Sequence, residues 1–363
     1  MSERHAQSST FACSACGGQM RFDPDQKQLV CAYCGAGKAI QAVAFDRRTY
    51  DLNAAPAPEQ MEWGTQVRSI RCPNCGAETV LSAQDTAAAC AFCGAPHVLE
   101  DTAQAGIAPE SLVPFHFQEK MARSSFQQWI RRRFFAPREV RKNAALGRIQ
   151  GVYLPYWAFD AKAEALYTGQ AGEHYYVTVT RTVQRDGKAV QEQVQEQRTR
   201  WRPTRGTVRR AFEEVLITAS KRLGMGTLQA LQPFNLGELV CYQPEYLAGF
   251  AAEKPQISLE EGWGSGRQIM ESQLTQDARE DILRHADEAR VENIEAAYRD
   301  TRYKLMLLPA YLSSFTFKGK AYHIAINGQN GRVSGDTPVS PWRVALVALA
   351  VVAILALIYF LTR

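Results

Sequence analysis

Four Cys-x-x-Cys pairs before residue 95 constrain this chain more than any other feature of its sequence. Eight of the nine cysteines belong to them, and the spacing of the first two pairs recurs 59 residues later in the other two. The flanks repeat as well, since CSACGG matches CPNCGA and CAYCGA matches CAFCGA. The chain therefore carries a duplicated module. Its cysteines are Cys13, Cys16, Cys31, Cys34, Cys72, Cys75, Cys90 and Cys93.

Cysteines in this arrangement are typical ligands of structural zinc. Each pair sits on a tight turn whose two thiolates converge, and two such turns complete a tetrahedron around Zn²⁺. The N-terminal residues contain no apolar run of the kind that a secretory signal requires, so we expect the thiols to stay reduced. We predict two zinc ribbons, at residues 10–40 and 69–98, and two Zn²⁺ ions per chain.

Two other kinds of cysteine site fit part of the pattern. A redox Cys-x-x-Cys motif needs a βαβ context, which the flanking sequence lacks, whereas an iron–sulfur cluster also uses four thiolates. A catalytic zinc site keeps one coordination position open, and four cysteines leave none. The pattern therefore favours a structural metal over a catalytic one.

The second constraining feature is the uncharged run VALVALAVVAILALIYFL at residues 344–361. Eighteen helical residues extend about 27 Å, close to the hydrocarbon thickness of a bilayer. Trp342 lies at one end and Tyr359 and Phe360 at the other, where interfacial aromatic residues are enriched. A buried C-terminal helix is the alternative, but a core helix does not need a run of this length without a polar face. We predict a transmembrane tail anchor at residues 343–362.

Between these two features we predict an α+β domain with antiparallel sheets at residues 115–336. Segments rich in proline, alanine or glycine predict linkers at 41–68 and 99–114. Apolar residues at helical spacing predict helices over 118–135 and 258–285.

The rest of this domain has the pattern of strands, mainly over residues 151–201 and 292–335. Asp186 and Gly187 predict a hairpin turn between two of them. The segments YLPYW at 153–157 and LLPAY at 307–311 both open a strand-like stretch. We interpret this echo as a sign of two related halves.

Two clusters of basic residues lie within the predicted domain. Residues 123–148 hold eight basic side chains against one acid, and residues 198–210 hold six arginines and no acid. Both clusters suit the phosphates of anionic lipid or of nucleic acid, or they form solvated faces that balance an acidic helix. The membrane surface is favoured because a span is already predicted. The candidate contacts are Arg131, Arg132, Arg133, Arg200, Arg202, Arg205, Arg209 and Arg210.

No common catalytic motif occurs in the sequence. It has no Gly-x4-Gly-Lys-Ser/Thr phosphate loop, no Gly-x-Ser-x-Gly and no His-Glu-x-x-His. We therefore predict that the protein is not an enzyme, and rank an unrecognised active site in the sheet domain last.

The order of these features resembles a known family. Two Cys-x-x-Cys ribbons, GVYLPYWAFD at 151–160, AYHIAINGQNGRVSGD at 321–336 and a terminal apolar helix are similar to the bacterial TFIIB-type zinc-ribbon membrane proteins of the YdjG-like group. Such proteins often carry the label of primosomal protein N′, a replication helicase, but this chain lacks the nucleotide-binding loop that a helicase needs. The resemblance implies a membrane-bound adaptor that works with phage-shock-protein-A-like and virion-core-like (flotillin-type) partners in envelope stress.

The leading prediction is a tail-anchored scaffold in the cytoplasmic (inner) membrane, with a single pass and the N-terminal domains in the cytoplasm. The ribbons would hold a partner protein, and Arg343 would stay on the cytoplasmic side. The alternative is a nucleic-acid-binding zinc-ribbon protein that acts in replication or transcription, whose binding would weaken steeply with salt.

Overall fold

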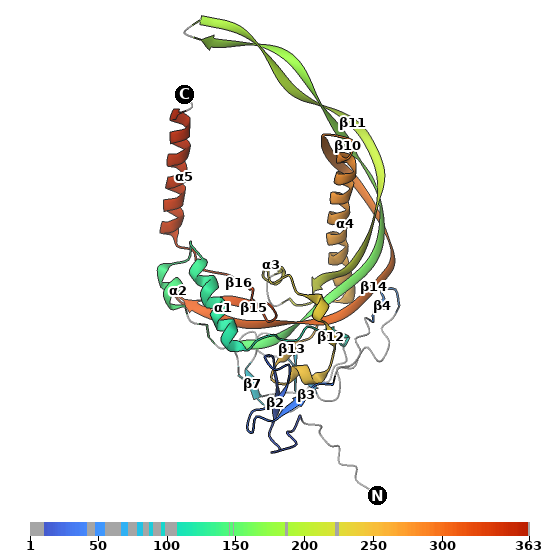
Figure 1. Cartoon of the computed structure of the whole chain (residues 1–363), viewed down its shortest axis with the longest axis vertical. Coiled ribbons are helices and arrows are strands. Elements are labelled where there is room, and N and C mark those ends of the chain that lie inside the picture. The colour runs from blue at the N-terminus through green and yellow to red at the C-terminus, as the bar shows by residue number, and fades with distance from the viewer. Residues whose placement is uncertain are drawn as a thin grey trace.

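An 11-stranded mixed sheet with very long central strands organises the chain (Figure 1). The two longest helices of the domain pack against one face of this sheet, a small three-stranded sheet of the first cysteine module packs below it, and one helix stands apart at the C-terminus. The computed structural model describes residues 11–41, 48–54, 67–71, 78–82, 87–89, 96–98, 107–144, 146–147, 149–185, 188–221 and 225–361.

Three strands account for most of the sheet: β10 (Gln150–Arg185), β11 (Lys188–Thr218) and β14 (Glu288–Phe317). β10 lies between the other two and is antiparallel to both. Its pairing with β14 ends where Gly172 meets Glu288, so β10 and β11 continue beyond that point as a two-stranded ribbon (Figure 1). The predicted turn at residues 186–187 lies outside the described residues, between these two strands.

The predicted helices and strands are confirmed, with one correction to the sheet. α1 (Glu119–Arg132) and α4 (Leu259–Leu283) occupy the two predicted helical segments. The sheet is mixed instead of antiparallel throughout, because β13 (Ala251–Glu253) is parallel to β10 and β9 (Ser111–Leu112) is parallel to β14.

Two of the segments expected to be linkers contribute strands to this sheet. β4 (Tyr50–Asp51) pairs with β14, and β9 pairs with both β14 and β12 (Val240–Cys241). β6 (Glu78–Ser82) of the second cysteine module pairs with β13, so this strand belongs to the large sheet. Each of these strands has two to five residues, too few to show a periodic pattern in the sequence.

The domain consists of two related halves, as the echo between YLPYW and LLPAY predicts. The first half runs β9, α1, β10, β11, and the second runs β13, α4, β14 and β15 (Lys320–Asn327). β10 and β14 are antiparallel neighbours, and Leu154 of the first half lies opposite Leu308 of the second. The carbonyls of Pro155 and Pro309 then accept equivalent hydrogen bonds, from the first residue after β11 and the first after β15. Helices of different length and hairpins of very different reach distinguish the two halves.

Over residues 152–159 of β10 both faces are buried, and alternate residues face opposite sides. Tyr153, Trp157 and Phe159 belong to the larger core cluster together with residues of α1, α4 and the first cysteine module. Leu154 and Tyr156 face the smaller cluster with the segment around α3.

The other elements are β5 (Val67–Arg71), β7 (Ala87–Ala89), β8 (Pro96–Val98), β16 (Val333–Gly335), α2 (Arg138–Asn143), α3 (Met225–Gln229), α5 (Pro341–Leu361) and the 3-10 helices η2 (Leu236–Glu238) and η3 (Pro244–Leu247).

Two glycines let α4 approach the sheet closely. A Cβ atom on Gly262 would lie 2.7 Å from Cδ1 of the buried Trp157, and one on Gly266 would lie 3.1 Å from the Phe159 ring. The Trp157 ring cannot move away easily, because its Nε1 donates a 2.9 Å hydrogen bond to the carbonyl of Ile257. The glycines that weaken this helix locally therefore serve its packing.

Alanine substitutions at two neighbouring glycines should have opposite effects. We expect Gly262→Ala to lower the free energy of unfolding by about 1–3 kcal/mol, because the added methyl group overpacks against Trp157. Gly264 has no atom within 4 Å of its Cβ position, so Gly264→Ala should raise stability by about 1 kcal/mol through helix propensity. Denaturant unfolding of both variants measures the difference, and equal effects would contradict the close approach.

Candidate functional site

The four cysteines of the first module converge on one point. They lie at one end of a small sheet of β1 (Met20–Asp23), β2 (Gln28–Cys31) and β3 (Gly37–Ala39), because Met20 at the start of β1 pairs with Cys31 at the end of β2. The Sγ atoms of Cys13 and Cys34 are 3.5 Å apart, as are those of Cys16 and Cys31, and all four lie within 4.8 Å of one another. A tetrahedral Zn²⁺ with Zn–S bonds of about 2.3 Å separates its sulfur ligands by about 3.8 Å. The donor set thus fits a tetrahedral metal ion.

Each cysteine pair is held by the same backbone turn. The N–H of Gly17 donates to the carbonyl of Cys13 at 2.8 Å, and the N–H of Gly35 donates to that of Cys31 at 3.1 Å. Both glycines have a positive φ, 70° and 73°, which a side chain would strain. The glycine after each second cysteine is therefore what lets its two thiols point to one side.

Backbone donors and crowding set the electrostatics of the four thiols. The N–H groups of Ala15 and Cys16 lower the pKa of Cys13, and those of Cys34 and Tyr33 lower the pKa of Cys31 to about 6. These donors favour thiolates.

Cys16 behaves differently. The N–H of Gly18 lowers its pKa, but the neighbouring Cys34 and Cys31 sulfurs outweigh this effect and raise the pKa to about 12. Four thiolates therefore do not share this space without a cation between them. A divalent metal would supply that positive charge, and with four sulfur ligands it would have no open position for chemistry.

The first module is packed against the domain and is not a free appendage. Cys13 and Cys31 are buried, 3% and 2% exposed, and belong to the larger core cluster. The ring of Phe22 lies 5.2 Å from that of Tyr246 in η3, and its N–H donates to the carbonyl of Ala248 at 2.9 Å. A metal ion here would stabilise part of the domain core as well as the ribbon.

The other four cysteines, Cys72, Cys75, Cys90 and Cys93, lie outside the described residues. The structure describes strands on both sides of each of their turns: β5 and β6 flank the first pair, and β7 and β8 flank the second.

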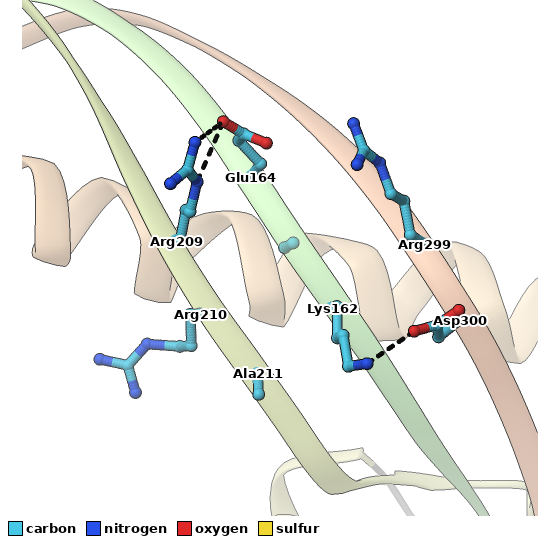
Figure 2. A pocket seen from close by; sticks show the side chains of 8 residues that line it. Lys162, Glu164, Arg209, Arg210, Ala211, Arg299 and Asp300 are labelled. Carbon is cyan, nitrogen blue, oxygen red and sulfur yellow. Dashed lines mark hydrogen bonds and ion pairs between the residues drawn. The ribbon is translucent and has the colours of Figure 1, made fainter.

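The arginines of the second basic cluster are mostly neutralised by acids. Arg209 pairs with Glu164 on β10 at 2.7 Å, whereas Arg210 points away from both and pairs with Asp277 of α4 at 2.5 Å (Figure 2). Arg202 pairs with Glu173 at 3.1 Å. Successive residues of a strand face opposite sides of the sheet, so the neighbours Arg209 and Arg210 do not form one patch in space.

Two further arginines of this cluster, Arg200 and Arg205, have no ion pair within the described part of the chain. Arg200 instead lies over the ring of Tyr175, 5.2 Å from its centroid. The ion pairs also hold the acids ionised, because the hydrogen bond from Arg209 lowers the pKa of Glu164, and that from Arg210 lowers the pKa of Asp277. A phosphate would have to displace a carboxylate from Arg209 or Arg210.

Three arginines of the first basic cluster lie near the start of α5. Arg131, Arg132 and Arg133 are exposed in the last turn of α1 and just after it, and none has an ion pair among the described residues. The N–H of Ser340 donates to the carbonyl of Phe135 at 2.8 Å, which holds the start of α5 beside this turn. Sequence reasoning missed this contact, because about 200 residues separate the two helices and no local pattern links them.

α5 itself is long and apolar enough to cross a membrane. It has 21 residues, and no part of its most apolar 18-residue window is buried against the rest of the protein. A helix that is apolar on every side and uncovered differs from a core helix, which packs its apolar surface inside the fold.

Comparison with known proteins gives one informative match. No family model matches the chain, and no solved structure matches it. The chain is similar to a Bacillus subtilis (strain 168) protein named "Uncharacterized protein YdjG", with 25% identity over 338 residues. The similarity covers 93% of this chain and 92% of that protein, and it supports the YdjG-like group.

Proposed function

We propose that the protein is a non-enzymatic, membrane-anchored scaffold on the cytoplasmic face of the bacterial inner membrane. The observation that carries this proposal is α5, an uncovered apolar helix attached to a polar, folded domain. At about 1.5 Å per residue it extends about 32 Å, enough for the hydrocarbon core of a bilayer.

The β10–β11 ribbon constrains how the protein meets the membrane. In Figure 1 the ribbon and α5 extend from the same side of the sheet. The β10–β11 ribbon is polar and pairs Arg181 with Glu192. It therefore does not share the hydrocarbon core with α5. The β10–β11 ribbon therefore stays in water when α5 inserts, which requires the axis of α5 to tilt away from the ribbon.

The proposal includes two Zn²⁺ ions, one for each cysteine module. The register of the strands around the second set of cysteines supports the second site. The strands that flank each cysteine turn pair identically in both modules, displaced by 59 positions. The equivalent pairs are Ala12–Gln19 and Arg71–Glu78, and Val30–Gly37 and Ala89–Pro96.

The partners in the proposal are other proteins, held through the metal-stabilised ribbons. The expected class is the phage-shock-protein-A-like and flotillin-type proteins of envelope stress that the family resemblance implies. The ion pairs of Arg202, Arg209 and Arg210 count against nucleic acid as the partner, because they leave little free positive charge on the sheet.

Affinity purification from detergent-solubilised membranes tests the scaffold role. We expect the full-length protein to retain partner proteins, and the variant Cys13→Ser/Cys31→Ser to lose them while it remains in the membrane fraction. The matched control Cys241→Ser changes a cysteine of β12 outside the ribbons and should retain them. Partners that stay bound to the ribbon variant would contradict the proposed role of the ribbons.

A further inference from the structure

Aromatic and basic side chains gather where α5 leaves the domain. Phe134, Phe135 and Trp342 are 55%, 44% and 70% exposed, although each is large and apolar. Arg343 donates to the carbonyl of Phe134 at 2.5 Å, and its guanidinium lies 5.6 Å from the centroid of that ring. Aromatic rings together with arginines are the side chains that proteins place at the level of lipid headgroups.

A cavity of about 410 Å³ opens beside this aromatic and basic surface, between α1 and the turn that connects β15 to β16. Its wall includes two guanidinium groups, and none of the described residues that line it is acidic. Asn330 and Ser125 add neutral polar groups from opposite sides. The polar lining residues are Ser125, Gln128, Arg132, Arg133 and Asn330.

Arg133 of this cavity is held by a ring contact, and neither Arg132 nor Arg133 has an ion pair among the described residues. Arg133 stacks on the half-buried Trp129, 4.4 Å from the ring centroid, and Trp129 packs against the buried Phe126. The hollow on the sheet shown in Figure 2 is different, since Lys162 there already binds Asp300 at 2.7 Å. Unpaired guanidinium groups in a cavity without carboxylates suit a phosphate, which accepts two parallel N–H bonds from one arginine.

We propose that this cavity binds the phosphate of an anionic phospholipid headgroup, with Arg132 and Arg133 as its main contacts and Phe134, Phe135 and Trp342 inserted at the interface around it. The inference rests on the proposed membrane anchoring by α5, because that helix brings the cavity to the headgroup layer. It assigns a lipid preference to the protein that the anchor alone does not give, since an uncharged helix does not distinguish headgroups.

Partition between two populations of vesicles tests the proposal. Detergent-solubilised full-length protein is offered vesicles of phosphatidylcholine and vesicles of phosphatidylcholine with phosphatidylglycerol, and its distribution is measured after detergent removal. We expect a preference for the anionic vesicles that falls with added salt, and a loss of roughly 10- to 30-fold in that preference for Arg132→Gln/Arg133→Gln. Arg132→Lys/Arg133→Lys should keep most of it, because the charge is retained.

Arg200→Gln/Arg205→Gln is the matched control, because it removes the same charge from exposed positions on the sheet. It should change the preference by no more than about twofold. The proposal is overturned if this control loses as much as Arg132→Gln/Arg133→Gln, if the lysine variant loses as much as the glutamine variant, or if the wild type inserts without any preference. Failure to insert into either kind of vesicle would instead count against the anchor, and arginine-dependent binding to DNA without a lipid preference would favour nucleic acid as the ligand.

Discussion

Cys31→Ser is expected to lower the bound zinc from about two equivalents per chain to about one. Cys31 is 2% exposed, and its Sγ lies 3.5 Å from the Sγ of Cys16. Its sulfur is therefore one of the buried donors of the four-cysteine cluster. Serine keeps the size of the side chain but offers a hydroxyl that stays protonated at neutral pH and is a poor ligand. Elemental analysis of the purified full-length protein measures the change.

Loss of this metal should also destabilise the domain. A structural zinc ion contributes on the order of 10 kcal/mol or more to the folding of a small ribbon. Here the ribbon also packs Phe22 against Tyr246 and Phe250, so an unfolded ribbon uncovers part of the domain core. We therefore expect earlier thermal unfolding and faster proteolysis of the variant.

Cys241→Ser is the control for this experiment, because Cys241 lies in β12 of the large sheet. It should leave the zinc content unchanged. The interpretation of the first module would be wrong if Cys31→Ser kept the full zinc content. Iron in place of zinc in the wild type would show that the four thiolates hold an iron–sulfur cluster.

The parts of the structure that follow from local patterns could be predicted from the sequence. The cysteine turns need only a two-residue spacing and a glycine, and both occur where Gly17 and Gly35 take a positive φ. The start of α4 is equally local: the hydroxyl of Ser258 accepts from the N–H of Glu261, and the Glu261 carboxylate accepts from the N–H of Ser258.

The parts that depend on distant partners could not be predicted. Arg209 and Arg210 look like one basic patch in the sequence, but their acids come from β10 and α4, 45 and 67 residues away. The two-residue strands β4 and β9 owe their existence to the edges of β14, since segments so short have no period of their own. The cavity beside Arg132 and Arg133 also forms between distant segments, because the turn that connects β15 to β16 lies against α1.

Membrane anchoring by α5 is the part of the proposed function on which the scaffold role and the lipid contact depend. Its test follows from the exposure of α5 along its whole length. No residue of this helix is buried, so a substitution near its middle does not disturb packing within the chain. An effect of charge in α5 on location would therefore come from the membrane and not from the fold. Val352 and Leu355, 63% and 60% exposed near the middle of the helix, are suitable positions.

Val352→Arg/Leu355→Arg should transfer the protein from the membrane pellet to the soluble fraction. An arginine at the centre of a span costs about 2.5–3.5 kcal/mol, so two of them oppose insertion by a factor of more than about 10³. Val352→Leu/Leu355→Val keeps the helix apolar and should stay in the membrane pellet after alkaline extraction, whereas the chain truncated after Ser340 should be soluble. If the arginine variant or the truncated chain remained in the extracted pellet, another part of the protein would hold it to the membrane, and α5 would have to be reinterpreted as a helix that docks on a partner.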